Sequence, residues 1–103
     1  MKNILSEIEN AFVWEGHAVS SINEASTEDK IFIDVTAWSS CEHDGDLSGI
    51  YSNVDSLKDE ILTNSKNDKY KVKSARIVNQ EKEYTNDGEF NVTIRGKVLI
   101  EKE

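Results

Sequence analysis

The residues best suited to site chemistry in this sequence are oxygen-bearing side chains in the middle of the chain. Asp44, Asp46, Ser48 and Asp55 follow one another at short intervals, and Gly49 stands among them. Carboxylate and hydroxyl oxygens are the ligands that a hard cation such as Ca²⁺ takes, in sets of six to eight. The spacing makes this stretch a candidate calcium site.

Counted from Asp44, these residues resemble the calcium loop of EF-hand and dockerin-like motifs. Asp46 stands at the third position, Ser48 at the fifth, Gly49 at the sixth and Asp55 at the twelfth. The resemblance implies a loop that wraps one Ca²⁺. The twelfth position carries Asp where that loop has a bidentate Glu. We therefore predict no metal and keep calcium binding as an alternative.

Cys41 and His43 are a second candidate for chemistry, because residues two apart on a strand point to the same side. A zinc site needs two further ligands, and the only other histidine is His17. A cysteine nucleophile needs an oxyanion hole, which no motif indicates, and glycine patterns for phosphate are absent from the sequence. We therefore predict no catalytic residues and no cofactor, and expect that the protein is not an enzyme.

Acidic residues dominate the first two thirds of the chain. The 103 residues carry a formal charge of −8, with thirteen Asp and Glu against four Lys up to residue 66, and seven acids against eight bases beyond it. Such a surface attracts a basic partner and repels nucleic acid and anionic membranes. A single cysteine favours a reducing compartment. We expect a cytoplasmic protein that makes no direct contact with nucleic acid or membrane and forms no stable homo-oligomer.

The clearest structural pattern is a period-2 alternation from Glu89 to Lys102, which predicts a half-buried strand. Asn86-Asp87-Gly88 favours a tight turn, so the partner strand is predicted over residues 70–84. A change of apolar phase between Lys73 and Ala75 predicts a β-bulge there, and Gly96 fits a local bend or a close backbone approach.

Shorter patterns predict the other elements. Apolar residues at helical spacing favour a helix over 2–14, ended by Gly16 as a positive-φ cap. Strands are predicted over 17–22 and 30–38, and Asp44-Gly45 as a hairpin turn into a short strand over 46–51. Ser52 is typical of an N-cap. It would begin a second helix whose apolar stripe is Val54, Leu57, Ile61 and Leu62.

The predicted fold is a single α+β domain over residues 1–103. It has an antiparallel sheet of four to five strands that ends in a long C-terminal hairpin, with two helices packed on one face of the sheet.

Large aromatic residues stand among the acids in the middle of the chain, where ten acids accompany two lysines from Glu24 to Glu60. Acids steer a basic partner, and desolvated aromatic side chains anchor it. We therefore expect a partner-binding surface made of Asp34, Trp38, Glu42, Asp44, Asp46, Tyr51, Asp55, Asp59 and Glu60.

The function that these features favour is a small acidic binding protein. Its most natural form is an immunity protein, an antitoxin of a toxin–antitoxin or contact-dependent growth inhibition pair. Its bacterial toxin would be a nuclease whose basic active-site cleft it covers. The alternatives are a calcium-binding module over residues 44–55, a thiol enzyme built on Cys41 and His43, a phage-encoded inhibitor that mimics nucleic acid, and acids kept for solubility alone.

Overall fold

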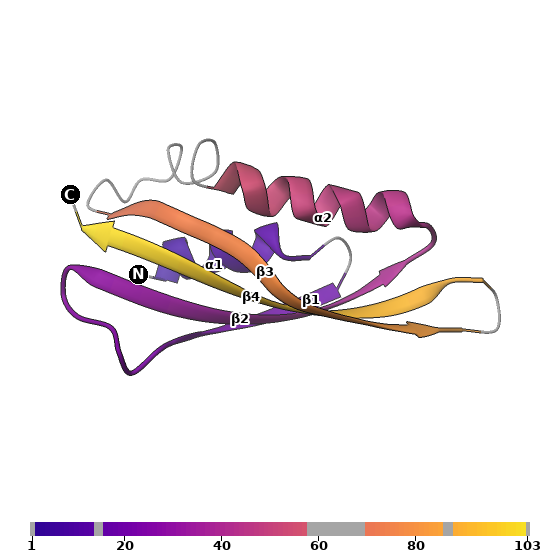
Figure 1. The fold of residues 1–103 in the computed structure, drawn as a ribbon, viewed down its shortest axis with the longest axis horizontal. Helices are drawn as coiled ribbons and strands as arrows, with labels where there is room; N and C mark the ends of the chain where they lie inside the picture. The colour runs from indigo at the N-terminus through magenta and orange to yellow at the C-terminus, as the bar shows by residue number, and fades with distance from the viewer. Residues whose placement is uncertain (1, 14–15, 58–69, 86–87, 103) are drawn as a thin grey trace.

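Four strands and two helices make up the part of the chain that the computed structural model describes, residues 2–13, 16–57, 70–85 and 88–102. In chain order these elements are α1 (Lys2–Ala11), β1 (Gly16–Ile22), β2 (Lys30–Cys41), α2 (Asp44–Ser56), β3 (Tyr70–Tyr84) and β4 (Phe90–Lys102) (Figure 1). The strands form one antiparallel sheet in the order β1-β2-β4-β3. The predicted α+β fold with its C-terminal hairpin is confirmed.

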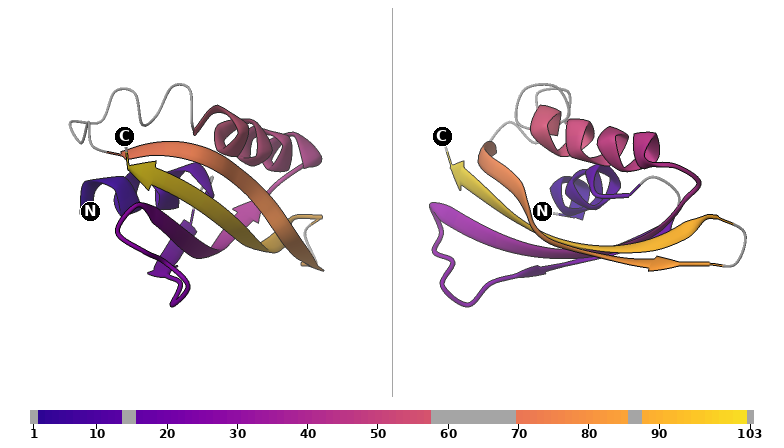
Figure 2. Two further views of the ribbon diagram at one scale, coloured as in Figure 1. Left: turned by 60° about the vertical axis from the view of Figure 1, so that its left-hand side comes forward. Right: turned by 45° about the vertical axis from the view of Figure 1, so that its right-hand side comes forward.

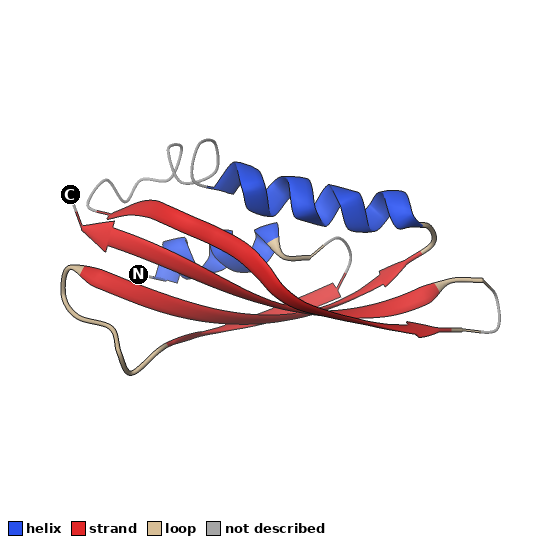
Figure 3. Cartoon of the chain, viewed as in Figure 1, coloured by secondary structure: helices blue, strands red, loops and turns tan. Residues whose placement is uncertain are grey.

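Both helices cover the same face of this sheet, as the two turned views show (Figure 2). The odd-numbered residues of β2 from Ile31 to Cys41 are buried beneath the helices, and the even-numbered ones are exposed or half-buried. In β4 the even-numbered residues from Phe90 to Ile100 are buried. We call the opposite side of the sheet the open face, because no described helix covers it (Figure 3). None of the described helices combines the length and the apolarity needed to cross a bilayer.

Phe12, just beyond the end of α1, packs its ring into the place of a side chain that Gly96 lacks. A Cβ atom on Gly96 would lie 1.9 Å from Cε1 of Phe12, whose side chain is fully buried. A local bend or a close backbone approach was predicted at Gly96, and the group that approaches it in the structure is a side chain. α1 is also tied to β1, because the backbone N–H of Ser20 donates to Oε1 of Glu9 at 3.0 Å.

Two β-bulges interrupt the long β3 strand. The register shifts between Val72 and Ser74, which confirms the predicted bulge, and again between Ile77 and Asn79, which the sequence analysis did not predict. Each extra residue turns the following side chains to the other side of the sheet. The turn that joins β3 to β4 has the expected positive φ at Gly88, +85°, while residues 86–87 lie outside the described residues.

The structure corrects the prediction for residues 44–56. The turn at Asp44-Gly45, the short strand over 46–51 and the N-cap at Ser52 are all wrong, because α2 begins at Asp44 with His43 as its N-cap. The apolar stripe extends back from Val54 and Leu57 at helical spacing, and burial of the whole stripe favours a helix. Its described members are Leu47, Ile50, Val54 and Leu57. The predicted Ile61 and Leu62 lie outside the described residues.

Gly16 also differs from its prediction, since it caps no helix and has no positive φ. α1 ends at Ala11, and Gly16 is the first residue of β1. A Cβ atom there would lie 1.8 Å from the carbonyl oxygen of Trp38 on β2. The glycine is therefore required by the close approach of two strands. β2 itself runs three residues beyond its predicted end, to Cys41.

Substitution of Gly96 by alanine tests the contact with Phe12. We expect Gly96→Ala to lower the free energy of unfolding by about 2 kcal/mol or more, because the new methyl group forces the Phe12 ring out of its place. Urea unfolding measures the change, with Thr93→Ala on the open face of the same strand as the control. Phe12→Leu should recover part of the loss in the double variant. Equal midpoints for Gly96→Ala and Thr93→Ala would contradict the proposed contact.

Candidate protein-binding face

Large apolar side chains are exposed on the open face of the sheet. Val19 is 60% exposed, Trp38 46% and Phe32 39%. In the antiparallel register His17 pairs with Trp38, so this histidine lies beside the indole on the same face. Val19 pairs with Thr36, so it lies near Trp38, whereas Phe32 stands six residues from Trp38 along β2. Neighbouring exposed apolar side chains mark interaction sites more often than isolated ones do. The open face is therefore the first candidate for a binding surface.

An acidic hollow lies on the open face close to Trp38. Trp38 pairs with Thr93 of β4, which in turn pairs with Glu81 of β3, so the backbones of Trp38 and Glu81 are separated by two strand spacings, roughly 10 Å. Glu83 is two residues further along β3 and pairs with Asn91. A hollow of about 340 Å³ is lined by Glu81, Lys82, Glu83, Asn91 and Thr93.

The charge of this hollow is negative. Arg95 Nη1 lies 3.7 Å from Oε1 of Glu81, but both side chains are more than half exposed, so the pair is weak. Lys82 has its ammonium 4.9 Å above the ring of Phe90, on the side of the sheet that the helices cover. Among the described residues no cation forms an ion pair with Glu83. A basic side chain of a partner would meet at least one carboxylate that no cation of the described residues neutralises.

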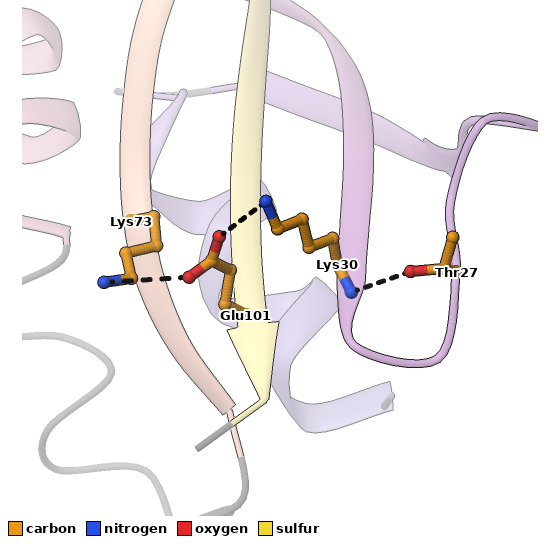
Figure 4. Close-up of polar contacts among 4 residues, drawn as sticks. All are labelled: Thr27, Lys30, Lys73 and Glu101. Carbon is orange, nitrogen blue, oxygen red and sulfur yellow. Dashed lines mark hydrogen bonds and ion pairs between the residues drawn. The ribbon is translucent and has the colours of Figure 1, made fainter.

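At the opposite end of the open face, an ion-pair network joins three strands. Glu101 of β4 lies between Lys30 of β2 and Lys73 of β3, with one carboxylate oxygen 3.6 Å from each ammonium (Figure 4). The backbone N–H of Lys30 donates to Oγ1 of Thr27 at 3.2 Å, which holds the start of β2. Both ammonium groups engage the carboxylate of Glu101, so this acid adds little negative surface there.

The described residues among those predicted to bind a partner do not form one surface. Asp34 and Trp38 lie on the open face of β2, whereas Tyr51 and Asp55 lie on the exposed side of α2, beyond the sheet. The hydroxyl of Tyr51 donates to Oε1 of Gln80 at 2.7 Å, on the helix side of β3. The sheet therefore separates the two aromatic residues, although both are exposed.

The remaining predicted residues lie elsewhere. Glu42 and Asp46 stand at the start of α2, Asp44 is its first residue, and Asp59 and Glu60 lie outside the described residues. The acids of the β1–β2 connection, such as Glu24 and Glu28, are separated from Glu42 by the whole of β2. Twelve residues of strand span roughly 35 Å. The acids that are close in sequence are thus divided among four places: the open face of β2, the β1–β2 connection, the start of α2 and the exposed side of α2.

Asp46 has a local structural role that accounts for its position. Its Oδ2 accepts a hydrogen bond from the backbone N–H of Glu42 at 2.9 Å, and its Oδ1 lies 3.7 Å from Nε2 of His43. A carboxylate in the first turn of α2 also suits the helix dipole. Because residues 44–56 form a helix, the loop geometry expected of a calcium site is absent there. No group of three or more metal-ligating side chains occurs among the described residues.

Cys41 and His43 do not share a face. The thiol of Cys41 is 1% exposed beneath the helices, whereas the side chain of His43 is 69% exposed beyond the end of β2. Burial raises the pKa of the Cys41 thiol above its usual value, and the charge of Asp46 raises it further, against a smaller lowering by Lys82. A buried thiol with a raised pKa is a poor nucleophile at neutral pH.

Comparison with known proteins relates the chain to one fold. No protein-family model matches it, and no curated protein sequence matches it. Among solved structures it is similar to the type 4 fimbrial biogenesis protein PilO from Pseudomonas aeruginosa, with a TM-score of 0.58 and 13% sequence identity. The match covers 100% of this chain and 69% of that chain. At this identity the likeness establishes a shared fold alone.

The sequence analysis missed Glu81 and Glu83 as candidate site residues. Their alternation with Lys82 along a predicted strand placed them on one side of it, but it did not show which side. The register with β4 decides this, because Glu81 pairs with Thr93 and thereby lies on the face of Trp38.

The burial of Cys41 predicts slow thiol chemistry. In the native protein at pH 8, we expect an aromatic disulfide reagent to modify Cys41 at least about a hundredfold more slowly than in urea, because access requires local opening. The matched control is Ser40→Cys with Cys41→Ser, which moves the thiol to the exposed neighbouring position. This control should react at nearly the unfolded rate. Rapid native modification of Cys41 would revive the thiol-enzyme hypothesis.

The hydrogen bond of Asp46 predicts a stability loss on its removal. We expect Asp46→Ala to lower the free energy of unfolding by about 1 kcal/mol, as for the loss of a helix cap. Asp55→Ala is the control, since Asp55 is exposed near the end of the same helix. Removal of an acid there should change stability little or raise it. Equal effects of the two substitutions in urea unfolding would exclude this role.

Proposed function

We propose that this chain is a protein-binding domain without catalysis of its own, and that it holds a basic partner at the Trp38 end of its open face. More specifically, we propose that the chain is a cytoplasmic immunity protein. The partner is then a bacterial toxin, such as a nuclease, that is neutralised when its basic cleft is covered. The observation that carries the proposal is an exposed Trp38 beside the hollow with Glu81 and Glu83.

The support is physical. A tryptophan that becomes desolvated in a partner's pocket supplies a large share of binding energy, and hot spots of interfaces are enriched in Trp. Carboxylates next to such an anchor form charge-assisted hydrogen bonds with Lys or Arg. They also raise the association rate by steering. Arg95 lies nearby and forms an ion pair with Glu81. It therefore repels a basic side chain of the partner less than an unpaired guanidinium would.

The open face also suits a partner because its residues do not support the core. Trp38 and Glu83 are exposed, and the helices bury only the other side of the sheet. Substitutions at these positions should therefore change binding with little change in folding. Because the binding residues and the core residues lie on different sides of the sheet, binding can be tested by substitution without loss of the fold.

The first step of the test recovers the partner. The tagged protein is purified from its native cell, and the co-purifying protein is identified by mass spectrometry. We expect a protein that is basic and toxic when produced alone, and whose toxicity disappears when this chain is produced with it. A partner that is acidic, or harmless by itself, contradicts the immunity function.

The second step tests the surface. With the recovered partner, we expect Glu81→Lys with Glu83→Lys to slow association about tenfold or more at low salt and to weaken its salt dependence. Trp38→Ala should chiefly accelerate dissociation and cost about 2 kcal/mol of binding free energy. The matched control is Glu28→Lys with Asp55→Lys, an equal charge change away from the hollow. It should slow association less than the substitutions in the hollow do. If the two double variants behave alike, net charge and not this surface governs binding.

A further inference from the structure

A pocket of about 400 Å³ lies on the open face, near the start of β2 and apart from the acidic hollow. Phe32 of β2 and Leu99 of β4, which pair directly across the two strands, give it an apolar surface. Asn23 and Ala25 line it from the β1–β2 connection. In Figure 1 this connection lies below the sheet, on the side away from the helices.

Hydrogen bonds hold this connection in place. The backbone N–H of Asn23 donates to the carbonyl oxygen of Phe32 at 2.8 Å, and Nδ2 of Asn23 donates to Oδ2 of Asp34 at 3.0 Å. Oγ of Ser26 accepts from the N–H of Phe32 at 2.9 Å, and the N–H of Ala25 donates to Oδ1 of Asn23 at 2.9 Å. These hydrogen bonds tie the loop that forms one side of the pocket to β2.

Two cations stand directly opposite each other in the pocket. Arg76 of β3 pairs with Lys97 of β4, and both line the pocket. Like charges at directly opposed positions of a sheet are destabilising. No acidic side chain of the described residues forms an ion pair with either of them. An anion placed between them would relieve this repulsion.

Asp34 limits the charge of that anion. It pairs with Lys97 from the other neighbouring strand and also lines the pocket. Together with Arg76 and Lys97 it gives the pocket a formal charge of one positive unit. That charge matches a monoanion and disfavours a dianion such as phosphate. The acidic Glu101 does not neutralise these two cations, because its carboxylate forms ion pairs with Lys30 and Lys73.

From this arrangement we infer that the pocket binds a carboxylate that carries an adjoining apolar group. The carboxylate lies between the guanidinium of Arg76 and the ammonium of Lys97 and accepts charge-assisted hydrogen bonds from both. The apolar group covers Phe32 and Leu99 and removes them from water. Such a group occurs in a free organic acid and at the C-terminus of a peptide that ends in an apolar residue. The inference is independent of the proposed function, which uses the other end of the face.

The test follows ¹⁵N-labelled protein by NMR during titration with 3-phenylpropionate. We expect saturable shifts confined to residues 23–25, 32–34, 74–76 and 97–99. Neutral 3-phenylpropanamide, acetate and phosphate should each bind at least about tenfold more weakly, the equivalent of losing one charge-assisted or apolar contact. A peptide that ends in Phe, with a free or an amidated C-terminus, distinguishes the two sources of carboxylate. Tighter binding of the free-acid peptide than of 3-phenylpropionate assigns a peptide terminus, and the reverse order assigns an organic acid.

Arg76→Gln and Lys97→Gln should each weaken binding of 3-phenylpropionate about tenfold, as expected for one charge-assisted contact. Arg95→Gln, which removes a cation from the same face outside the pocket, should leave it unchanged. The spectrum of each variant reports whether it is folded, and two independent variants keep the test decisive if one is not. Equal affinity for the acid and its amide, or no saturable shifts at millimolar ligand, overturns the inference.

Discussion

Burial of one side of the sheet beneath both helices is the interaction on which the rest of the structure depends. The fully buried side chains come from α1, α2 and the central strands β2 and β4, with Phe12 seated over Gly96 near the middle. Each such side chain contributes about 1.5 to 3 kcal/mol relative to its exposure in water. Because this core uses only one side of the strands, the side chains on the other side stay exposed or half-buried. Both candidate binding sites lie on that side.

The sequence predicted the elements whose pattern is local and missed the one that packing decides. The alternation of β4 is visible in the sequence, but the side chain that packs against Gly96 is not. α2 contains Gly45 and Gly49, each of which costs an isolated helix about 1 kcal/mol relative to alanine. An Asp-Gly dipeptide by itself favours a turn. Burial of Leu47 and Ile50 overrides both preferences, and this burial exists only once the sheet is assembled.

The candidate site was predictable for Trp38 but not for the acids beside it. Which side of β3 faces the helices depends on two bulges, and the second lies between Ile77 and Asn79. Without it, Glu81 and Glu83 would point beneath the helices, and Lys82 would point to the open face, because a slip of one residue exchanges the two sides. Neither the composition nor the residue spacing of β3 predicts this bulge. The acidic hollow is therefore a consequence of register.

Separation along the strands determines how the charge of this protein can act. On β2, Ser40 lies in line with Glu83 and Asp34 with Arg76, and these two rows are six residues apart, roughly 20 Å. At physiological ionic strength the Debye length is about 8 Å, so the acidic and the cationic ends of the open face are screened from each other. Each end then interacts according to its own groups, one with a cation and the other with an anion. The formal charge of −8 describes the chain as a whole and neither of its two sites.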